Sequence, residues 1–284
     1  MNPIYIRIIT ALLIISIIIS CKKNDADSNA DLIVINGYLY EGAPVDSIHL
    51  AKTVSFESTD TIYPPVTDAR VSISWNNNTF DLQSIGNGYY NYPGSDLLVK
   101  EGDSYSISVK YNGKVATSTT TVPKKPAGID LSDTIIYVDT TFSFTPPGSG
   151  NSGSSDNDNG LKITWNNPEN NYYYVVIENT DPNARDIERG SDSFFGERPR
   201  NFTFRSSPFK GEEYTINAMN LKKYGKQRVK VYRVNQEYAD LYENRNQDSR
   251  TLSEPITNIT NGLGIFTAFS YAESYFTVEN EINK

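Results

Sequence analysis

The sequence is poor in the residues that build most metal and nucleophilic sites, with one cysteine and one histidine in 284 residues. A single cysteine cannot form an internal disulfide, so the fold depends on its core alone. One histidine is too few for a zinc site, which takes several histidine or cysteine ligands. A serine or cysteine nucleophile usually needs a histidine base, and His49 is the sole candidate, with no catalytic signature around it. We therefore expect no enzyme activity, no metal and no cofactor, and we assign His49 to a strand surface.

Clusters of positive charge are also absent. The chain carries 26 Lys and Arg against 34 Asp and Glu, a formal net charge of −8. Nucleic-acid binding needs a basic face to meet the phosphates, so no nucleic-acid partner is expected. No glycine-rich loop opens a helix as a phosphate cradle would. The carboxylates could include the acid pair of a polysaccharide hydrolase, but nothing singles out two of them.

The only long apolar run lies at the start of the chain. Arg7 precedes a run from Ile8 to Ile19, which is shorter than the roughly 20 apolar residues that span a bilayer. This arrangement is typical of a signal peptide, here residues 1–20. The segment ends in Ile18-Ile19-Ser20-Cys21, with a branched aliphatic residue three places before a cysteine and a small residue next to it. That is the bacterial lipoprotein processing pattern, so we expect lipid attachment at Cys21.

Lipidation predicts a protein that is anchored to a membrane rather than spanning it. Each buried methylene contributes about 0.8 kcal/mol, so two or three acyl chains hold a protein stably. Residues 21–30 are polar and unpatterned, which is typical of a flexible tether. Asp25 and Asp27 fit either a short acidic surface-export signal or a plain solvated spacer.

The first half of the remaining chain is a series of short segments that alternate apolar and polar residues, as half-buried strands do. Residues 71–75 precede Asn76-Asn77-Asn78, which is turn chemistry, so a hairpin is expected there. Asn112-Gly113 joins two further strands and is the favoured dipeptide of a type I′ turn. About seven strands at spacings near ten residues predict an immunoglobulin-like β-sandwich over residues 31–125.

Residues 126–160 are expected to connect two domains. Their last part, Pro146 to Gly160, is rich in Gly, Ser and Asp and cannot bury a core. Asp156 and Asp158 lie two apart, as calcium ligands can, but Ser155 stands where the first carboxylate of a calcium loop should be. We therefore expect no metal site in this segment.

Residues 161–280 predict a second sandwich. An alternating strand ends at Trp165 and is followed by an aromatic and β-branched strand, which is similar to strands B and C of fibronectin type III domains. There the tryptophan packs between the sheets. Asn235 can cap one helix near residues 236–246. The predicted fold class is therefore all-β, with two β-sandwich (immunoglobulin/fibronectin III-like) domains and one short helix in the second.

Tyrosine is abundant, with 20 residues in the chain. Strand propensity and sheet packing account for part of this number. Tyrosine also presents a rigid, amphipathic face, which binding surfaces exploit. In a strand, Tyr172 and Tyr174 share one face. Both alternatives, sheet packing and a ligand or partner surface, stay open for the crowded tyrosines: Tyr89, Tyr90, Tyr92, Tyr172 and Tyr174.

Seven segments together carry a family resemblance: residues 33–39, 49–56, 66–71, Glu237-Tyr238, Leu241-Tyr242, 255–259 and 261–266. In the last and most specific of them, Gly262 and Gly264 flank Leu263, which predicts a backbone bend that side chains would block. With these segments the chain resembles the DUF4249 family of Bacteroidetes lipoproteins.

The resemblance implies an outer-membrane location, with the cell surface favoured over the periplasmic face. It also implies association with a TonB-dependent, SusC-like transporter, and it brings no catalytic residues. The leading hypothesis is therefore a non-catalytic binding partner of such a transporter in nutrient uptake. A structural or adhesive module that binds other envelope proteins is the alternative, and a polysaccharide hydrolase is the third.

Overall fold

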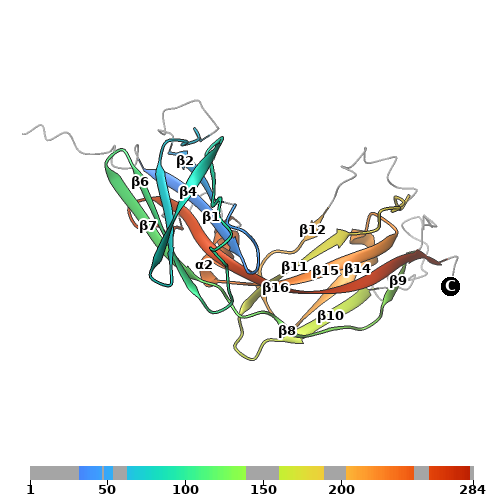
Figure 1. Cartoon of the computed structure of the whole chain (residues 1–284). Coiled ribbons are helices and arrows are strands. Elements are labelled where there is room, and N and C mark those ends of the chain that lie inside the picture. The colour runs from blue at the N-terminus through green and yellow to red at the C-terminus, as the bar shows by residue number, and fades with distance from the viewer. Residues whose placement is uncertain are drawn as a thin grey trace, which may run out of the picture.

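The computed structural model describes residues 32–46, 48–53, 63–138, 160–188, 203–245 and 256–281. Within these ranges the chain is built from strands, with one α-helix and one 3-10 turn, and it forms two β-sandwiches (Figure 1). This confirms the predicted all-β class. No helix in the described ranges is long and apolar enough to cross a membrane. Residues 1–20, Cys21 and the tether lie outside the described residues, and so does most of the 146–160 loop.

The N-terminal sandwich is formed by seven strands in the hydrogen-bonded order β1-β2-β5-β4-β3-β6-β7. Inward side chains alternate with outward ones along β1, and the inward ones enter a core with Leu50, Ile73 and Ile107. An isolated bridge between Thr117 and Thr260 ties the last strand back toward the first. The strands are β1 (Ile33–Tyr40), β2 (Ile48–Lys52), β3 (Arg70–Trp75), β4 (Asn78–Gly86), β5 (Tyr89–Asn91), β6 (Ser104–Tyr111) and β7 (Lys114–Thr121).

The two predicted hairpins of this sandwich are confirmed. β3 and β4 pair antiparallel around Asn76 and Asn77, whose φ angles are 49° and 62°. β6 and β7 pair antiparallel around Asn112 and Gly113, whose φ angles are 47° and 74°. Two successive residues with positive φ match the twist of the flanking strands, which is why Asn and Gly occupy these positions.

The C-terminal sandwich packs two sheets around a separate core. Its small sheet has the order β14-β10-β8, and the facing layer contains β11, β15 and the second half of β16. Trp165, at the end of β10, is buried in this core as predicted. The strands are β8 (Ala127–Leu131), β9 (Ile135–Val138), β10 (Gly160–Asn166), β11 (Tyr172–Asn179), β12 (Phe204–Arg205), β13 (Phe209–Lys210), β14 (Glu213–Asn217), β15 (Gly225–Val234) and β16 (Leu263–Asn280), with the 3-10 turn η3 at Ala218–Asn220.

One strand, β16, belongs to both sandwiches. Residues 263–269 pair in parallel with β1, and residues 269–278 pair antiparallel with β15 (Figure 1). The N-terminal sandwich therefore includes the first part of a strand from the end of the chain. The expected boundaries, 31–125 and 161–280, place all of that strand in the second domain. β8 and β9 lie within the expected connecting segment 126–160 and are strands of the second sandwich. Alternation identifies a strand but not its partner, so these pairings were not predictable from it.

Gly264 makes the bend at the start of β16. Its φ is +99°, and a Cβ there would collide with the carbonyl oxygen of Ile35 on β1. The predicted blocked bend is therefore confirmed at this residue, although Leu263 beside it is half-buried rather than buried. Close backbone approach and a positive φ both require glycine.

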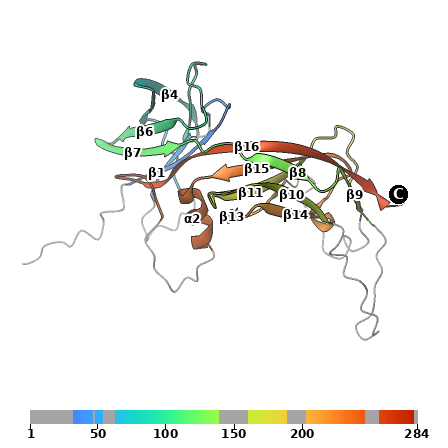
Figure 2. The same cartoon turned by 90° about the horizontal axis from the view of Figure 1, so that it is seen from below.

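The helix α2 (Gln236–Arg245) covers the junction of the two sandwiches. Figure 2 shows it on the opposite side of β16 from β6 and β7. Asn235, at its start, donates from its side-chain amide to Thr120 Oγ1 and to the carbonyl oxygen of Thr121 on β7. The helix and the strands beneath it share a cluster that we call the aromatic joint: Tyr38, Tyr40, Tyr174, Tyr232, Tyr238 and Phe269.

Candidate functional site

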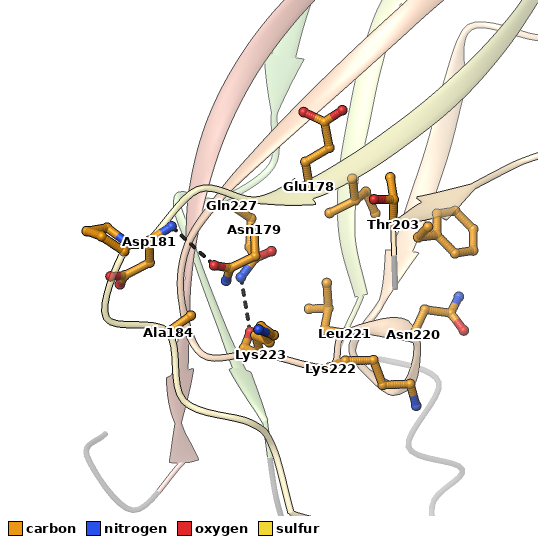
Figure 3. A pocket seen from close by; sticks show the side chains of 13 residues that line it. Glu178, Asn179, Asp181, Ala184, Thr203, Asn220, Leu221, Lys222, Lys223 and Gln227 are labelled. Carbon is orange, nitrogen blue, oxygen red and sulfur yellow. Dashed lines mark hydrogen bonds between the residues drawn. The ribbon is translucent and has the colours of Figure 1, made fainter. Parts of the chain in front are cut away.

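Figure 3 shows the residues that line a cavity of about 320 Å³. It lies at the end of the C-terminal sandwich that is farthest from the N-terminal one. The end of β11, the start of β15, the residues after η3 and Phe204 of β12 form its walls. Its distal position follows from strand pairing, because Gly225 at the start of β15 pairs with Val278 near the end of β16. We call this site the tip cavity.

Side chains that hydrogen-bond to the backbone hold the walls of the tip cavity in place. Asn179 donates from its side-chain amide to the carbonyl oxygen of Tyr224 at 3.0 Å and accepts from the backbone N–H of Asp181 at 3.1 Å. Gln227, which is buried, donates to the carbonyl oxygens of Lys223 and Gly225 at 3.0 and 3.3 Å. Such bonds fix the loops on both sides, because breaking one would leave a buried polar group unsatisfied.

One lining residue of the tip cavity, Glu178, belongs to a cluster of charged groups of both signs. Arg228 donates two hydrogen bonds to Glu178 Oε2, at 3.1 and 2.6 Å, and Lys230 lies 3.5 Å from the same atom. Partial burial raises the pKa of Glu178, but the hydrogen bond from Arg228 and the charges of Lys230 and Arg228 outweigh it and hold that pKa below its ordinary value. Figure 3 shows the Glu178 carboxylate directed away from Asn179 and Gln227.

The composition of the tip cavity suits reversible binding of a small polar group. The residues that line it include Asn220 with an amide, Thr203 with a hydroxyl, Phe204 with an aromatic ring and Lys222 with an ammonium group. Polar groups around an apolar wall fix the orientation of a ligand while the wall excludes water. In the described part of the chain, no three His, Cys, Asp or Glu residues lie close enough together to hold a metal ion.

The predicted tyrosines near β5 separate into exposed and buried ones. Tyr89 is 47% exposed, and its ring lies 4.6 Å from the ring of His49 on β2. Tyr90 is 1% exposed, and its hydroxyl oxygen accepts from the backbone N–H of Ala69. Tyr90 is therefore corrected from surface candidate to core residue, because alternation in a strand turns adjacent side chains to opposite faces.

Tyr92 lies between these two extremes. It is half-buried, packs edge-on against Phe80 at 5.4 Å and donates to Asp96 Oδ1 at 2.6 Å. The hydrogen bond to this carboxylate raises the pKa of Tyr92. Its hydroxyl is committed to a neighbouring loop, so its role in the structure is to fix that loop.

Tyr172 and Tyr174 share one face of β11, as predicted, but only one of them reaches solvent. Tyr174 is 2% exposed and stacks on Tyr232 at 4.7 Å inside the aromatic joint. It is therefore corrected from surface candidate to packing residue, because α2 covers this part of the sheet. Tyr172 is half-buried, with the ammonium of Lys210 4.5 Å above its ring. Burial raises the pKa of both Tyr174 and Tyr232 well above the usual range.

None of the predicted tyrosines lines the tip cavity, and the residues that do were not singled out from the sequence. One local signal for them existed. Asn179 and Asp181 follow directly on the apolar run of β11 and precede Pro182, which is typical of a strand ending in a side-chain-stabilised turn. That signal marks a turn, and only the fold places the turn beside η3 and β15.

Residues 22–274 match the model of a family described as a domain of unknown function, DUF4249. The chain belongs to the DUF4249 family. This confirms the resemblance drawn from the segments on β1, α2 and the start of β16. No curated protein matches this DUF4249 chain in sequence.

Two solved structures show distant similarity to this DUF4249 protein. One contains domains A168–A170 of titin, with 14% identity, a TM-score of 0.21, and coverage of 87% of this chain and 66% of that one. The other is a calcium-stabilised adhesin that helps an Antarctic bacterium bind ice, with 12% identity, a TM-score of 0.23, and coverage of 89% and 50%. The chain thus spans just under two thirds of the first and half of the second. At these TM-scores the similarity assigns no function.

Proposed function

We propose that the chain is a non-catalytic, lipid-anchored envelope protein that presents its tip cavity and the surrounding loops to a TonB-dependent transporter in the outer membrane. The observation that carries the proposal is the continuity of β16. It joins an N-terminal sandwich, whose first strand begins 12 positions after the proposed lipid-attachment site Cys21, to a C-terminal sandwich that ends in the tip cavity.

The geometry makes the body a rigid spacer. β16 has 18 residues and spans roughly 60 Å at about 3.3 Å per residue. β1 begins at Ile33, which pairs at the end of the N-terminal sandwich opposite to the tip cavity. A chain anchored through Cys21 would therefore hold the tip cavity away from the bilayer, where a transporter loop or its ligand could reach it.

A binding role fits the chemistry better than catalysis does. His49 packs against the ring of Tyr89 in the N-terminal sandwich, at the opposite end of the molecule from the tip cavity. Of the two carboxylates that line the tip cavity, Glu178 is paired with Arg228 and Lys230, and Asp181 accepts a hydrogen bond from the backbone N–H of Asn183. A carboxylate whose pKa is lowered by ion pairing is a poor general acid or base near neutral pH.

Co-purification tests the proposed partner. A tagged full-length chain is solubilised from outer membranes in mild detergent, and a TonB-dependent transporter is expected to co-purify with it. A Cys21→Ser chain, which cannot be lipidated, is the control and should lose the transporter together with the membrane. A wild-type chain that emerges alone contradicts the proposal, and one that emerges with other envelope proteins favours the adhesive alternative.

A second comparison tests whether the tip is the contact. Asn220→Ala with Lys222→Glu changes two side chains at the opening of the tip cavity. Asn78→Ala with Lys100→Glu makes matched changes at exposed positions of the N-terminal sandwich, away from the tip cavity. The first pair should weaken co-purification and the second should not. Equal effects of the two pairs would exclude the tip as the contact.

A further inference from the structure

We propose that the end of the N-terminal sandwich where β1 begins is a membrane-contact surface, which rests on anionic lipid headgroups. This deepens the lipid-anchored placement proposed above and depends on it. β1 runs parallel to the first residues of β16, so its start lies at the end away from the C-terminal sandwich, at the upper left of Figure 1. We call this region the anchor-proximal end.

Strand pairing collects several separate segments at the anchor-proximal end. Ile33 pairs with Lys52, whose backbone N–H donates to the carbonyl oxygen of Pro64. The turn at residues 86–88 joins β4 to β5, and the backbone N–H of Leu50 donates to Gly88 in that turn. Asn261, just before β16, donates from its side chain to the carbonyl oxygen of Val115, which places the β6–β7 turn there too.

Exposed apolar side chains are concentrated on these segments. Seven large apolar side chains are exposed in the described part of the chain, and four of them belong to this end. The remaining three are Leu98, Met219 and Tyr275, which lie elsewhere. The four are Tyr63, Ile85, Tyr89 and Val115, with exposed fractions of 56%, 60%, 47% and 38%. Aromatic and aliphatic side chains gathered on one surface mark a site that contacts another phase or protein.

The described charges at this end are opposite in sign to the net charge of the whole chain. Among the described residues, four exposed basic side chains lie on the segments named above or at the start of β3, and Asp68 carries the one exposed carboxylate there. The whole chain has a formal net charge of −8. A basic patch on an acidic protein is attracted to anionic headgroups, at about 1 kcal/mol per Lys or Arg near the surface. The basic residues are Lys52, Arg70, Lys110 and Lys114.

The length of the tether decides that a lipid surface is the occupant. Leu32, the first described residue, lies 11 positions after Cys21, so the two are at most about 40 Å apart. β16 alone is longer than that. A lipid on Cys21 therefore keeps the anchor-proximal end close to the bilayer, and tyrosine rings suit its headgroup level because one edge is polar.

Vesicle binding of the unlipidated protein tests the surface. The probe is the mature chain from residue 21 with Cys21→Ser, which retains every described residue, mixed with vesicles of phosphatidylglycerol and phosphatidylcholine or of phosphatidylcholine alone. Sedimentation at low salt should show binding to the anionic vesicles only. Ile85→Ser with Tyr89→Ser should reduce partitioning about tenfold. Lys110→Gln and Lys114→Gln should each reduce it about fivefold, and added salt should weaken it further.

The matched control removes exposed apolar side chains that lie outside the anchor-proximal end. Leu98 and Met219 are 50% and 61% exposed, and Leu98→Ser with Met219→Ser should leave partitioning unchanged. Equal losses in the control and in the Ile85/Tyr89 variant would overturn the proposal, and so would binding that ignores vesicle charge.

Hydrogen exchange is a second readout, for the case in which the anchor-proximal end contacts the bilayer only when the chain is lipidated. In the lipidated full-length chain, backbone amides of residues 84–89 and 111–115 should exchange hydrogen more slowly in vesicles than in detergent. Unchanged exchange with the lipid confirmed on Cys21 by mass spectrometry would overturn the membrane-contact surface alone. A chain without lipid on Cys21 would overturn the proposed anchoring, and the vesicle experiment would still decide the surface.

Discussion

The aromatic joint and the tip cavity lie on the same two strands, β11 and β15, and are built in opposite ways. In the joint, Tyr174 and Tyr232 stack at 4.7 Å and fill the space under α2. At the tip, Asn179 and Gln227 occupy the ends of the same strands and bond to loop backbone, leaving a cavity of about 320 Å³. Packed aromatic rings fill the volume between elements and couple them, whereas polar side chains that hydrogen-bond to loop backbone can keep a cavity open.

The joint and the tip therefore have different structural roles. The joint connects β1, β11, β15, β16 and α2, so it fixes the two sandwiches relative to each other. The tip carries no such packing, and its shape depends on a few hydrogen bonds. We therefore expect mutations in the joint to change global stability, and mutations at the tip to change local order.

Phe269→Ala is expected to have the largest effect. Phe269 is 1% exposed, stacks on Tyr40 at 5.0 Å and meets Tyr238 edge-on at 4.8 Å. Truncating a buried phenylalanine usually costs about 3–5 kcal/mol in the free energy of unfolding. Because the side chain touches strands of both sandwiches, both should be destabilised, as measured by urea denaturation.

The two tryptophans allow each sandwich to be followed separately. Trp75 lies in the N-terminal sandwich and Trp165 in the C-terminal core, so Trp75→Phe and Trp165→Phe chains each report one half by fluorescence. Tyr275→Ala, on the same strand but 40% exposed, is the control and should cost about 1 kcal/mol or less. A loss confined to one tryptophan would show that the joint does not couple the sandwiches.

Gly264→Ala should be the next most damaging change. It forces a non-glycine residue to a φ of +99°, and the new Cβ would collide with the carbonyl oxygen of Ile35. Strained backbone of this kind costs about 1–3 kcal/mol before the collision is added. Gly42→Ala is the control, because its φ of +75° is also positive but nothing lies within 4 Å of its Cβ. Thermal unfolding that shifts equally in both variants would exclude the collision.

The strands were largely predictable, and their partners were not. Alternation and turn residues such as Asn112-Gly113 are local signals, and the structure confirms the hairpins they predicted. The pairing of β1 with β16 joins residues more than 220 positions apart, and no local pattern records it. Gly264 was the one residue that hinted at this pairing. A glycine required for close approach implies that another backbone lies beside it, but it does not identify which strand that backbone belongs to.

The candidate site was the less predictable part. The abundance of tyrosine suggested binding surfaces, but two of the candidates are buried. Tyr90 points from β5 into the N-terminal core, and α2 covers Tyr174. The tip cavity brings together Asn179, Asn220 and Gln227 from three segments. Each segment ends in ordinary turn chemistry, and only their meeting in space makes a cavity.

Asn179→Ala tests the tip half of the comparison and should have a moderate effect. It removes the hydrogen bonds that link Asn179 to Tyr224 and Asp181. A partner left unsatisfied costs about 1–3 kcal/mol. Amides of residues 181–188 should exchange hydrogen faster, while those of the aromatic joint should not. Asn166→Ala, at an exposed position at the end of β10 away from the tip, is the control. Faster exchange across both regions would contradict the proposed independence of joint and tip.

Glu178→Gln should have the smallest effect, and it is visible as a pH dependence. Glu178 lies on β11 between the joint and the tip, and its pKa is lowered in the folded chain by Arg228 and Lys230, against the opposing effect of burial. A lowered pKa contributes stability that is present above the unfolded value near 4.5 and is lost as the pH falls through the folded value. The pair is partly exposed, so the contribution should be no more than about 1 kcal/mol. The free energy of unfolding, measured by urea denaturation between pH 7 and pH 3, should therefore decline less steeply for Glu178→Gln than for wild type.

Glu213→Gln is the control, because its ion pair with Lys162 is more exposed and should change the slope less. Equal slopes in all three chains would mean that the ion pairs of Glu178 position the carboxylate without stabilising the fold.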